Sequence, residues 1–182
     1  MNRMIPPIVA MAALVALSNY TVQFPINDWL TWGALTYPVT FLVTDLTNRA
    51  LGPARARIVV LVGFVLAVAL SIWLATPRIA LASGAAFLFA QLLDVAVFNR
   101  FRQTDKWWAA PLAGSVIGSV LDTFLFFSIA FQGTDMPWVT LALGDLLVKG
   151  AMAVVLLAPY GWALPYLVPF ERRAPERRVS PG

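Results

Sequence analysis

Residues 58–76 read IVVLVGFVLAVALSIWLAT, a run of nineteen residues that carries no charge. A helix needs about 20 mainly apolar residues to cross the hydrocarbon core of a bilayer, because each residue adds only about 1.5 Å of length. Similar stretches lie on both sides of this run, separated by short polar breaks. We place six predicted spans at residues 4–22, 29–47, 58–76, 80–99, 109–131 and 138–160. The sequence therefore predicts an all-α integral membrane protein, with a transmembrane domain at 1–168 and a basic tail at 169–182.

The composition excludes several function classes. With 60% hydrophobic and 12% charged residues, the chain cannot cover a core with a hydrated surface. It contains no Cys and no His, which excludes thiolate nucleophiles, imidazole bases and the usual zinc and haem ligands. We therefore expect no metal, no cofactor and no catalytic residue. The net charge of +4 lies in short clusters between apolar runs, so we expect no nucleic-acid partner and contact with the lipid bilayer instead.

The basic residues also predict the orientation. Placed on alternate sides of the spans, eleven fall on one side and Arg78 alone falls on the other; the eleven are Arg3, Arg49, Arg55, Arg57, Arg100, Arg102, Lys106, Arg172, Arg173, Arg177 and Arg178. Cytoplasmic loops carry the excess of Lys and Arg, so both termini should be cytoplasmic in a bacterial inner membrane. The first span could instead be a signal peptide, which would leave five spans. The oligomeric state stays open, a homo-oligomer included.

Five ionisable residues fall inside the predicted spans: Asp45, Asp94, Asp122, Asp145 and Lys149. Such residues are costly in hydrocarbon and mark function by default. Counting along the helices sorts them into two layers. Asp122, Asp145 and Lys149, with the amide Gln91, fall between the outer third and the midplane, whereas Asp45 and Asp94 fall near the cytoplasmic ends.

The inner layer repeats one pattern, in which an acid precedes Asn-Arg at a cytoplasmic helix end. Asp45 precedes Asn48 and Arg49, at the i and i+4 spacing that favours an ion pair. Asp94 precedes the pair Asn99 and Arg100. These residues form either anchoring ion pairs at the interface or an inner gate.

In the outer layer, Asp145 and Lys149 share a helix face at i and i+4, which suits either a structural ion pair or a ligand site. Asp122 has no basic partner in its own span, and its face carries Gly118 and Ser119. Small residues of this kind usually indicate close helix packing. Asp122 is therefore the strongest single candidate for binding a ligand.

The second span carries a stripe of hydroxyl groups on one face, formed by Thr36, Thr40, Thr44 and Thr47. Threonines in membrane helices commonly bond their own i−4 carbonyl. Pro38 interrupts the helix, however, and irregular backbone in a membrane is tolerated where it lines a cavity. Asn19, Gln23, Trp32 and Thr36 should then gather near the outer mouth.

Several blocks in order resemble the queuosine-precursor transporters, also called the vitamin uptake transporter family. They are Ser18-Asn19-Tyr20, Thr31-Trp32-Gly33-Ala34, Thr44-Asp45-Leu46-Thr47, Ala90-Gln91, Asp94-Val95, Phe98-Asn99-Arg100, Trp107-Trp108, Asp122-Thr123, Phe126-Phe127, and Asp145 with Lys149. The resemblance implies six helices similar to the substrate-binding subunits of energy-coupling-factor transporters. It also implies uptake of 7-cyano-7-deazaguanine or 7-aminomethyl-7-deazaguanine.

A substrate of this kind fits the polar residues. A guanine-like edge presents adjacent N–H donors that Asp122 or Asp145 can accept, and its carbonyl can accept from Lys149 or Gln91. Trp32 or Phe126 offers a stacking face.

Two other functions compete with a single-protein transporter. The first is a binding subunit of an ATP-driven energy-coupling-factor complex. The second is an intramembrane aspartyl protease, but Leu121 precedes Asp122 and Ala142-Leu143-Gly144-Asp145 lacks the first glycine of the usual signature.

Overall fold

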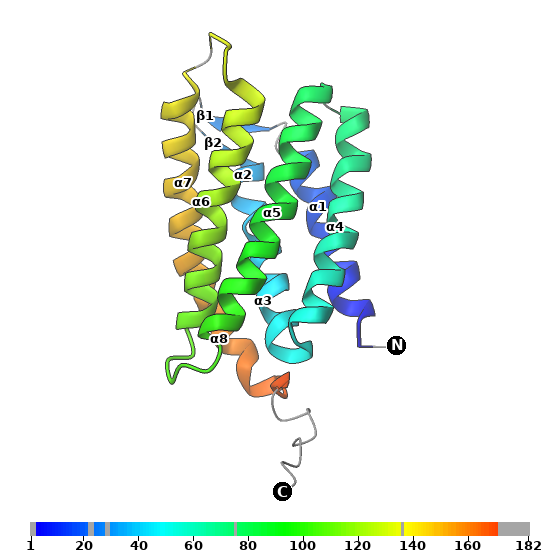
Figure 1. Ribbon diagram of the computed structural model, residues 1–182, viewed down its shortest axis with the longest axis vertical. Helices are drawn as coiled ribbons and strands as arrows, with labels where there is room; N and C mark the ends of the chain where they lie inside the picture. Colours follow the sequence, from blue (N-terminus) through cyan, green and yellow to red (C-terminus); the bar gives the residue numbers. More distant parts are fainter. Residues whose placement is uncertain (1–2, 22–23, 28–29, 75, 136, 171–182) are drawn as a thin grey trace, which may run out of the picture.

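The computed structural model describes residues 3–21, 24–27, 30–74, 76–135 and 137–170. Its elements are α1 (Ile5–Thr21), β1 (Pro25–Asn27), β2 (Leu30–Thr31), α2 (Trp32–Thr36), α3 (Val39–Leu51), α4 (Pro53–Leu74), α5 (Pro77–Phe101), α6 (Ala109–Phe131), α7 (Trp138–Val155), α8 (Leu157–Ala163) and the 3₁₀ turn η1 (Leu164–Tyr166). The predicted all-α bundle is confirmed (Figure 1). One short antiparallel hairpin, β1–β2, adds to it between α1 and α2. Most of the predicted basic tail, residues 171–182, lies outside the described residues.

Four segments are long and apolar enough to cross a membrane: Pro53–Trp73, Pro77–Phe101, Ala109–Phe131 and Trp138–Tyr166. They correspond to the last four predicted spans. The first predicted span forms α1, which is apolar but shorter. The second is divided into α2 and α3, so its interruption near Pro38 is confirmed.

The break between α2 and α3 follows from the chemistry of proline. Pro38 has no N–H to donate, and its φ of −59° begins α3 without a side-chain cap. Before Pro38, Tyr37 N still donates to the Gly33 carbonyl, four residues earlier, at 2.9 Å. After Pro38 the bonds shorten to i−3, with Thr40 N donating to the Tyr37 carbonyl at 3.0 Å and Phe41 N to the Pro38 carbonyl at 3.1 Å. The break presents Tyr37 at the start of α3.

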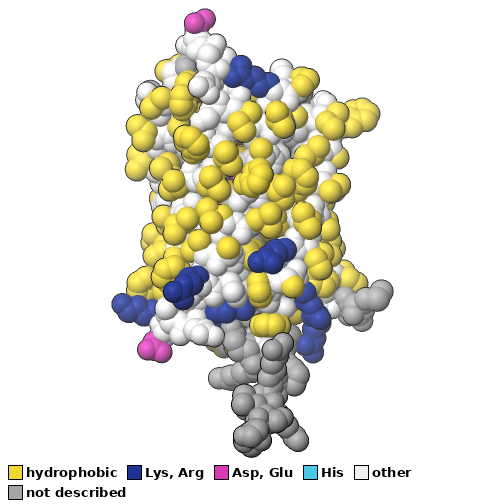
Figure 2. Space-filling model, viewed as in Figure 1, with side chains coloured by type: hydrophobic (Ala, Val, Ile, Leu, Met, Phe, Trp, Pro, Cys, Tyr) yellow, Lys and Arg dark blue, Asp and Glu magenta, His cyan; other side chains and the backbone are white. Residues whose placement is uncertain are grey.

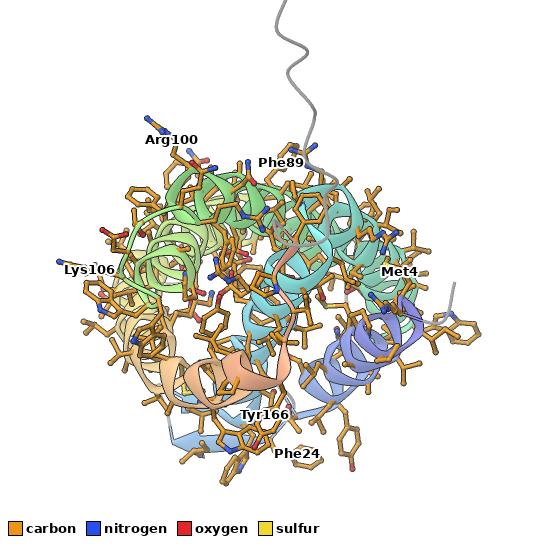
Figure 3. All side chains as sticks on the ribbon, turned by 90° about the horizontal axis from the view of Figure 1, so that it is seen from below. Met4, Phe24, Phe89, Arg100, Lys106 and Tyr166 are labelled. Atoms are coloured by element: carbon orange, nitrogen blue, oxygen red, sulfur yellow. The ribbon has the colours of Figure 1, made fainter. Side chains whose placement is uncertain are left out.

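Helix α3 lies in the middle of the bundle, where it packs against α1, α4, α5 and α6 (Figure 3). Helix α5 packs closely along α6. Glycines permit this approach: a Cβ added at Gly118 would lie 2.8 Å from the Phe41 ring and 3.1 Å from the Ala90 carbonyl oxygen. The bundle therefore brings polar residues of α3, α5 and α6 into one interior.

The outside and the inside of the bundle have opposite character. Large apolar side chains cover its exposed face, and Lys and Arg gather mostly at the end where α1 begins and α8 ends (Figure 2). The buried polar residues include Thr40, Thr44, Asp45, Gln91, Asp94, Ser115, Asp122, Thr123 and Lys149. An apolar exterior around a polar interior suits a protein that encloses a polar ligand within a bilayer.

Candidate functional site

Lys149 organises the first polar group of the interior. It lies on α7 and is 5% exposed. Its Nζ lies 2.6 Å from Asp122 Oδ2 and also pairs with Asp145 Oδ2, one turn earlier on α7. A longer contact of 3.3 Å joins Nζ to Thr123 Oγ1, which itself donates to Asp145 Oδ2 at 2.7 Å. We call Asp122, Thr123, Asp145 and Lys149, together with Tyr37, the Lys149 cluster.

Tyr37 joins this cluster from the helix break. Its hydroxyl donates to Asp122 Oδ1 at 2.7 Å, across 85 residues of sequence. The Lys149 ammonium also lies 5.5 Å from the centre of the Tyr37 ring, within the range of a cation–π contact. Tyr37 was not among the residues predicted from the sequence, although its position before Pro38 in a polar span could have indicated it.

The cluster carries two carboxylates and one ammonium group, so its formal charge is −1 when all three are ionised. Buried ion pairs are tolerated only where further hydrogen bonds satisfy the remaining atoms. Both oxygens of Asp122 have partners, and its side chain is 5% exposed. The side chain of Asp145 is 19% exposed, and among the described residues only its Oδ2 receives hydrogen bonds. Asp145 Oδ1, on a partly exposed side chain, is therefore a carboxylate oxygen of the cluster that no described residue uses.

The pairing of Asp122, Asp145 and Lys149 differs in one respect from the pairing expected from the sequence. The sequence pattern predicted an i, i+4 pair between Asp145 and Lys149, and the structure forms it. The case for Asp122 was that its own span holds no base. Lys149 now reaches it from the neighbouring helix, so one ammonium group serves both acids.

Gln91 binds the hydroxyl stripe of α3. Its Nε2 donates to Thr40 Oγ1 at 2.8 Å, and its Oε1 accepts from Thr44 Oγ1 at 2.7 Å. It is completely buried. The structure therefore places Gln91 outside the hydrogen bonds of the Lys149 cluster, in a second polar group between the two predicted layers.

The other threonines of the stripe mainly bond their own helix. Thr36 and Thr47 donate to the carbonyls of Trp32 and Val43, each four residues earlier. Thr36 also lies 3.0 Å from the Thr21 hydroxyl, which ties α2 to the end of α1. Thr36, Thr40 and Thr44 therefore each bond a second helix as well, and for Thr47 the described bond is to its own helix.

The remaining predicted residues, Asn19 and Trp32 of the outer mouth and Phe126 as a stacking face, lie on three elements, α1, α2 and α6. Gln23 lies outside the described residues. Asn19 Nδ2 donates to the Val15 carbonyl within α1. Trp32, at the start of α2, is 53% exposed. Phe126 packs edge-on against Phe127, with 5.2 Å between the ring centres.

In the inner layer, the prediction of an ion pair between Asp45 and Arg49 is wrong. Asp45 Oδ2 accepts from Ser115 on α6 at 3.3 Å, and Arg49 Nη1 donates to the Arg102 carbonyl at 3.2 Å. The free carbonyls at a helix end attract guanidinium groups. Arg102, which the sequence analysis treated only as a charge, likewise donates to the carbonyl of Asn48 at 2.6 Å.

Asp94 is also separated from the residues that share its pattern. It is completely buried, whereas Asn99 and Arg100 are exposed. The spacing explains this, because residues five and six positions later lie roughly 140° and 240° around a helix. The inner layer thus contains two buried carboxylates without an ion-pair partner among the described residues.

Comparison with known proteins gives consistent similarities. A family model described as "Putative vitamin uptake transporter" matches residues 31–76 and 70–163. The chain is 38% identical to a probable queuosine precursor transporter of Haemophilus influenzae, over 83% of this chain and 82% of the relative. It is 36% identical to the queuosine precursor transporter of Escherichia coli, over 85% and 83% of the two chains, and 29% identical to a probable one of Bacillus subtilis, over 79% and 75%. No solved structure matches the chain.

Proposed function

Because the chain belongs to the vitamin uptake transporter family, we propose that it imports a queuosine precursor across the bacterial inner membrane. The substrate is 7-cyano-7-deazaguanine, 7-aminomethyl-7-deazaguanine, or both. The names of the Haemophilus and Escherichia relatives support the substrate class. The apolar helices support a multi-pass membrane protein.

The observation that carries the proposal is the accessible oxygen of Asp145 beside a buried ammonium group. A guanine-like edge places two N–H donors next to a carbonyl. Asp145 Oδ1 can accept from the donors, since no described residue uses it. The Lys149 contact to Thr123, at 3.3 Å, is longer than its contacts to the two acids, so a substrate carbonyl can replace it. Charge-assisted bonds of this kind are about twice as strong as neutral ones.

Asp122 has a different role in this arrangement. Tyr37 and Lys149 each use one of its oxygens. A carboxylate has about four lone-pair sites, so Asp122 can still accept one substrate donor while it holds Lys149 in place. The break at Pro38 then matters for recognition, because it sets the position of the Tyr37 hydroxyl.

The alternative is a binding subunit of an ATP-driven energy-coupling-factor complex. The chain contains no phosphate-binding loop of the Walker type, so ATP would have to act on another subunit. Uptake by the purified protein alone, reconstituted in lipid vesicles, distinguishes the two. We expect labelled 7-cyano-7-deazaguanine to enter without ATP or a second protein. Binding without uptake, restored only by an ATPase module, would instead support the alternative.

A further inference from the structure

Asp45 and Asp94 form a buried acidic pair on facing helices. Asp94, on α5, is completely buried, and neither of its carboxylate oxygens has a hydrogen-bond partner among the described residues. Asp45, on α3, is 2% exposed, and only its Oδ2 has a partner, the Ser115 hydroxyl. Three carboxylate oxygens in one interior therefore lack a donor. The Lys149 cluster, by comparison, satisfies every buried oxygen of its acids.

Two consecutive residues of α6, Gly114 and Ser115, each contact one of the two acids. Ser115 donates to Asp45, and Gly114 contacts Asp94 so closely that an added Cβ would collide with Asp94 Oδ1. The same Cβ would lie 3.2 Å from the Asp94 carbonyl oxygen. Glycine at position 114 therefore allows α6 to fit against both carboxylates at once. The two carboxylates therefore both lie against the same turn of α6.

The basic groups around the pair are engaged elsewhere. On the packed helices α4 and α5 they are all exposed: Arg55, Arg57, Arg78 and Arg100. Helix α1 contains no charged residue. Arg49 donates to the Arg102 carbonyl, and Arg102 donates to Asn48. No described cation forms an ion pair with either acid.

The remaining titratable groups nearby are Asp122 and Tyr160. Asp122, two turns along α6 from Ser115, is held by Tyr37 and Lys149. Tyr160 of α8 lines a cavity of about 10 Å³ together with Asp45 and Ser115. That volume is near the lower limit for one water molecule. Asp45 therefore borders a cavity of about the size of one water molecule on the side that faces α8.

Two ionised carboxylates in this setting would each cost several kcal/mol of desolvation, with added repulsion. One proton removes much of this cost, because it neutralises one of the two charges and supplies an O–H donor to a region where three carboxylate oxygens have none. Hard metal cations take about six or more oxygen ligands. No group of three or more metal-ligating side chains exists among the described residues. The chemistry thus favours a proton over a metal ion.

We propose that Asp45 and Asp94 bind one proton and couple uptake to the proton gradient. The proposal rests on the transport function given above. When the protein is open to the outside, one carboxylate takes up a proton from external water and forms one O–H bond. When the protein is open to the cytoplasm, that bond breaks and the proton passes to cytoplasmic water. One proton therefore enters with each substrate. The pair reaches the Lys149 cluster through the same helices: α5 carries Gln91 three residues before Asp94, and Gln91 bonds Thr44, the neighbour of Asp45.

The test uses the full-length protein in vesicles loaded with unlabelled 7-cyano-7-deazaguanine or with buffer alone. For one proton per substrate, a gradient of one pH unit, alkaline inside, should give about tenfold accumulation of labelled substrate. Asp94→Asn should lose this accumulation, since a neutral amide cannot exchange a proton. It should keep exchange of labelled for unlabelled substrate, which needs no net proton movement. Asp45→Asn should behave alike, and Asp105→Asn, in the exposed turn after α5, should match the unchanged protein.

Three outcomes would overturn the proposal. The first is accumulation by both Asn variants at the level of the unchanged protein. The second is accumulation driven by a sodium gradient and not by the pH gradient. The third is an absence of substrate-dependent proton entry into vesicles of the unchanged protein, reported by a trapped pH dye, which decides the matter even if both variants fail to fold. Failure of the transport function itself looks different, because the unchanged protein would then neither bind nor exchange the deazaguanine.

Discussion

The buried ammonium group of Lys149 neutralises charge on two acids. The stability of the Lys149 cluster therefore depends more on Lys149 than on any other residue in it. Its ammonium group contacts Asp122 and Asp145 and lies over the Tyr37 ring. Removing the partner of a buried charge costs more than the pair itself contributes, because the remaining charge stays in a low-dielectric interior. The expected effect of a substitution here therefore depends on the net charge that it leaves.

We expect Lys149→Met to destabilise the protein by about 3–5 kcal/mol, since two buried carboxylates lose their cation. The double variant Lys149→Met with Asp122→Asn should recover most of that loss, because one of the two charges is then absent. Thermal unfolding in detergent measures both. If the double variant were as unstable as the single one, lost packing rather than charge would explain the result.

At the residue scale, the sequence predicts which charged residues belong to the candidate site, but it does not predict all of their hydrogen-bond partners. Asp122, Asp145 and Lys149 were identifiable because an ion inside a span needs a partner. The position of Tyr37 before Pro38 indicates only that it belongs to a polar, interrupted span; its contact with Asp122 depends on how the break between α2 and α3 packs against α6. The spacing of Asp45 and Arg49 permitted an ion pair, yet carbonyl groups at the helix end compete for the same guanidinium group.

At the scale of elements, the contact of α6 with α3 and α5 positions the Lys149 cluster and the acids Asp45 and Asp94. Small residues on α6 carry this contact, and Gly118 is the most confined of those that touch α3. Its neighbours are the buried Phe41 ring and the backbone of α5. Backbone cannot move aside as a flexible side chain can.

Gly118→Ala should therefore destabilise the bundle by about 1–3 kcal/mol, the usual cost of overpacking. Gly144→Ala on α7 is the matched control, because an added Cβ there meets nothing within 4 Å. Thermal unfolding of the two variants, side by side, checks the difference. Equal stability would mean that α3 and α6 are less tightly packed than described.

The elements themselves were largely predictable, because runs of apolar residues and prolines determine where membrane helices can form. The break at Pro38 is an example. The hairpin β1–β2 was not expected, since its strands span three and two residues and have no periodic pattern to detect. The way Gln91 joins α5 to α3 also depends on tertiary packing, which no local pattern contains.

For the whole molecule, the distribution of charge predicts how it sits in the membrane. When the Lys and Arg residues of the sequence are assigned to alternate sides of the predicted spans, eleven fall on the side assigned to the termini and Arg78 falls on the other. We expect a reporter enzyme fused after Gly182 to be active in the cytoplasm. Activity only in the periplasm would show that the topology is the reverse of the predicted one. The Lys149 cluster would then lie nearer the cytoplasmic face.

The whole molecule is an apolar bundle around three buried polar groups: the Lys149 cluster, the group around Gln91, and the acids Asp45 and Asp94. The Lys149 cluster is proposed to recognise the substrate. The most direct test is equilibrium binding of 7-cyano-7-deazaguanine to purified Asp145→Asn protein. This change turns the accessible acceptor into an amide and leaves Asp122 to pair with Lys149. A lost charge-assisted bond costs roughly 1.5–3 kcal/mol, so affinity should fall about tenfold to a hundredfold while thermal stability stays close to that of the unchanged protein. Asp135→Asn, in the exposed turn between α6 and α7, should bind normally. Unchanged affinity in a folded Asp145→Asn protein would contradict the assignment of the substrate site to this cluster.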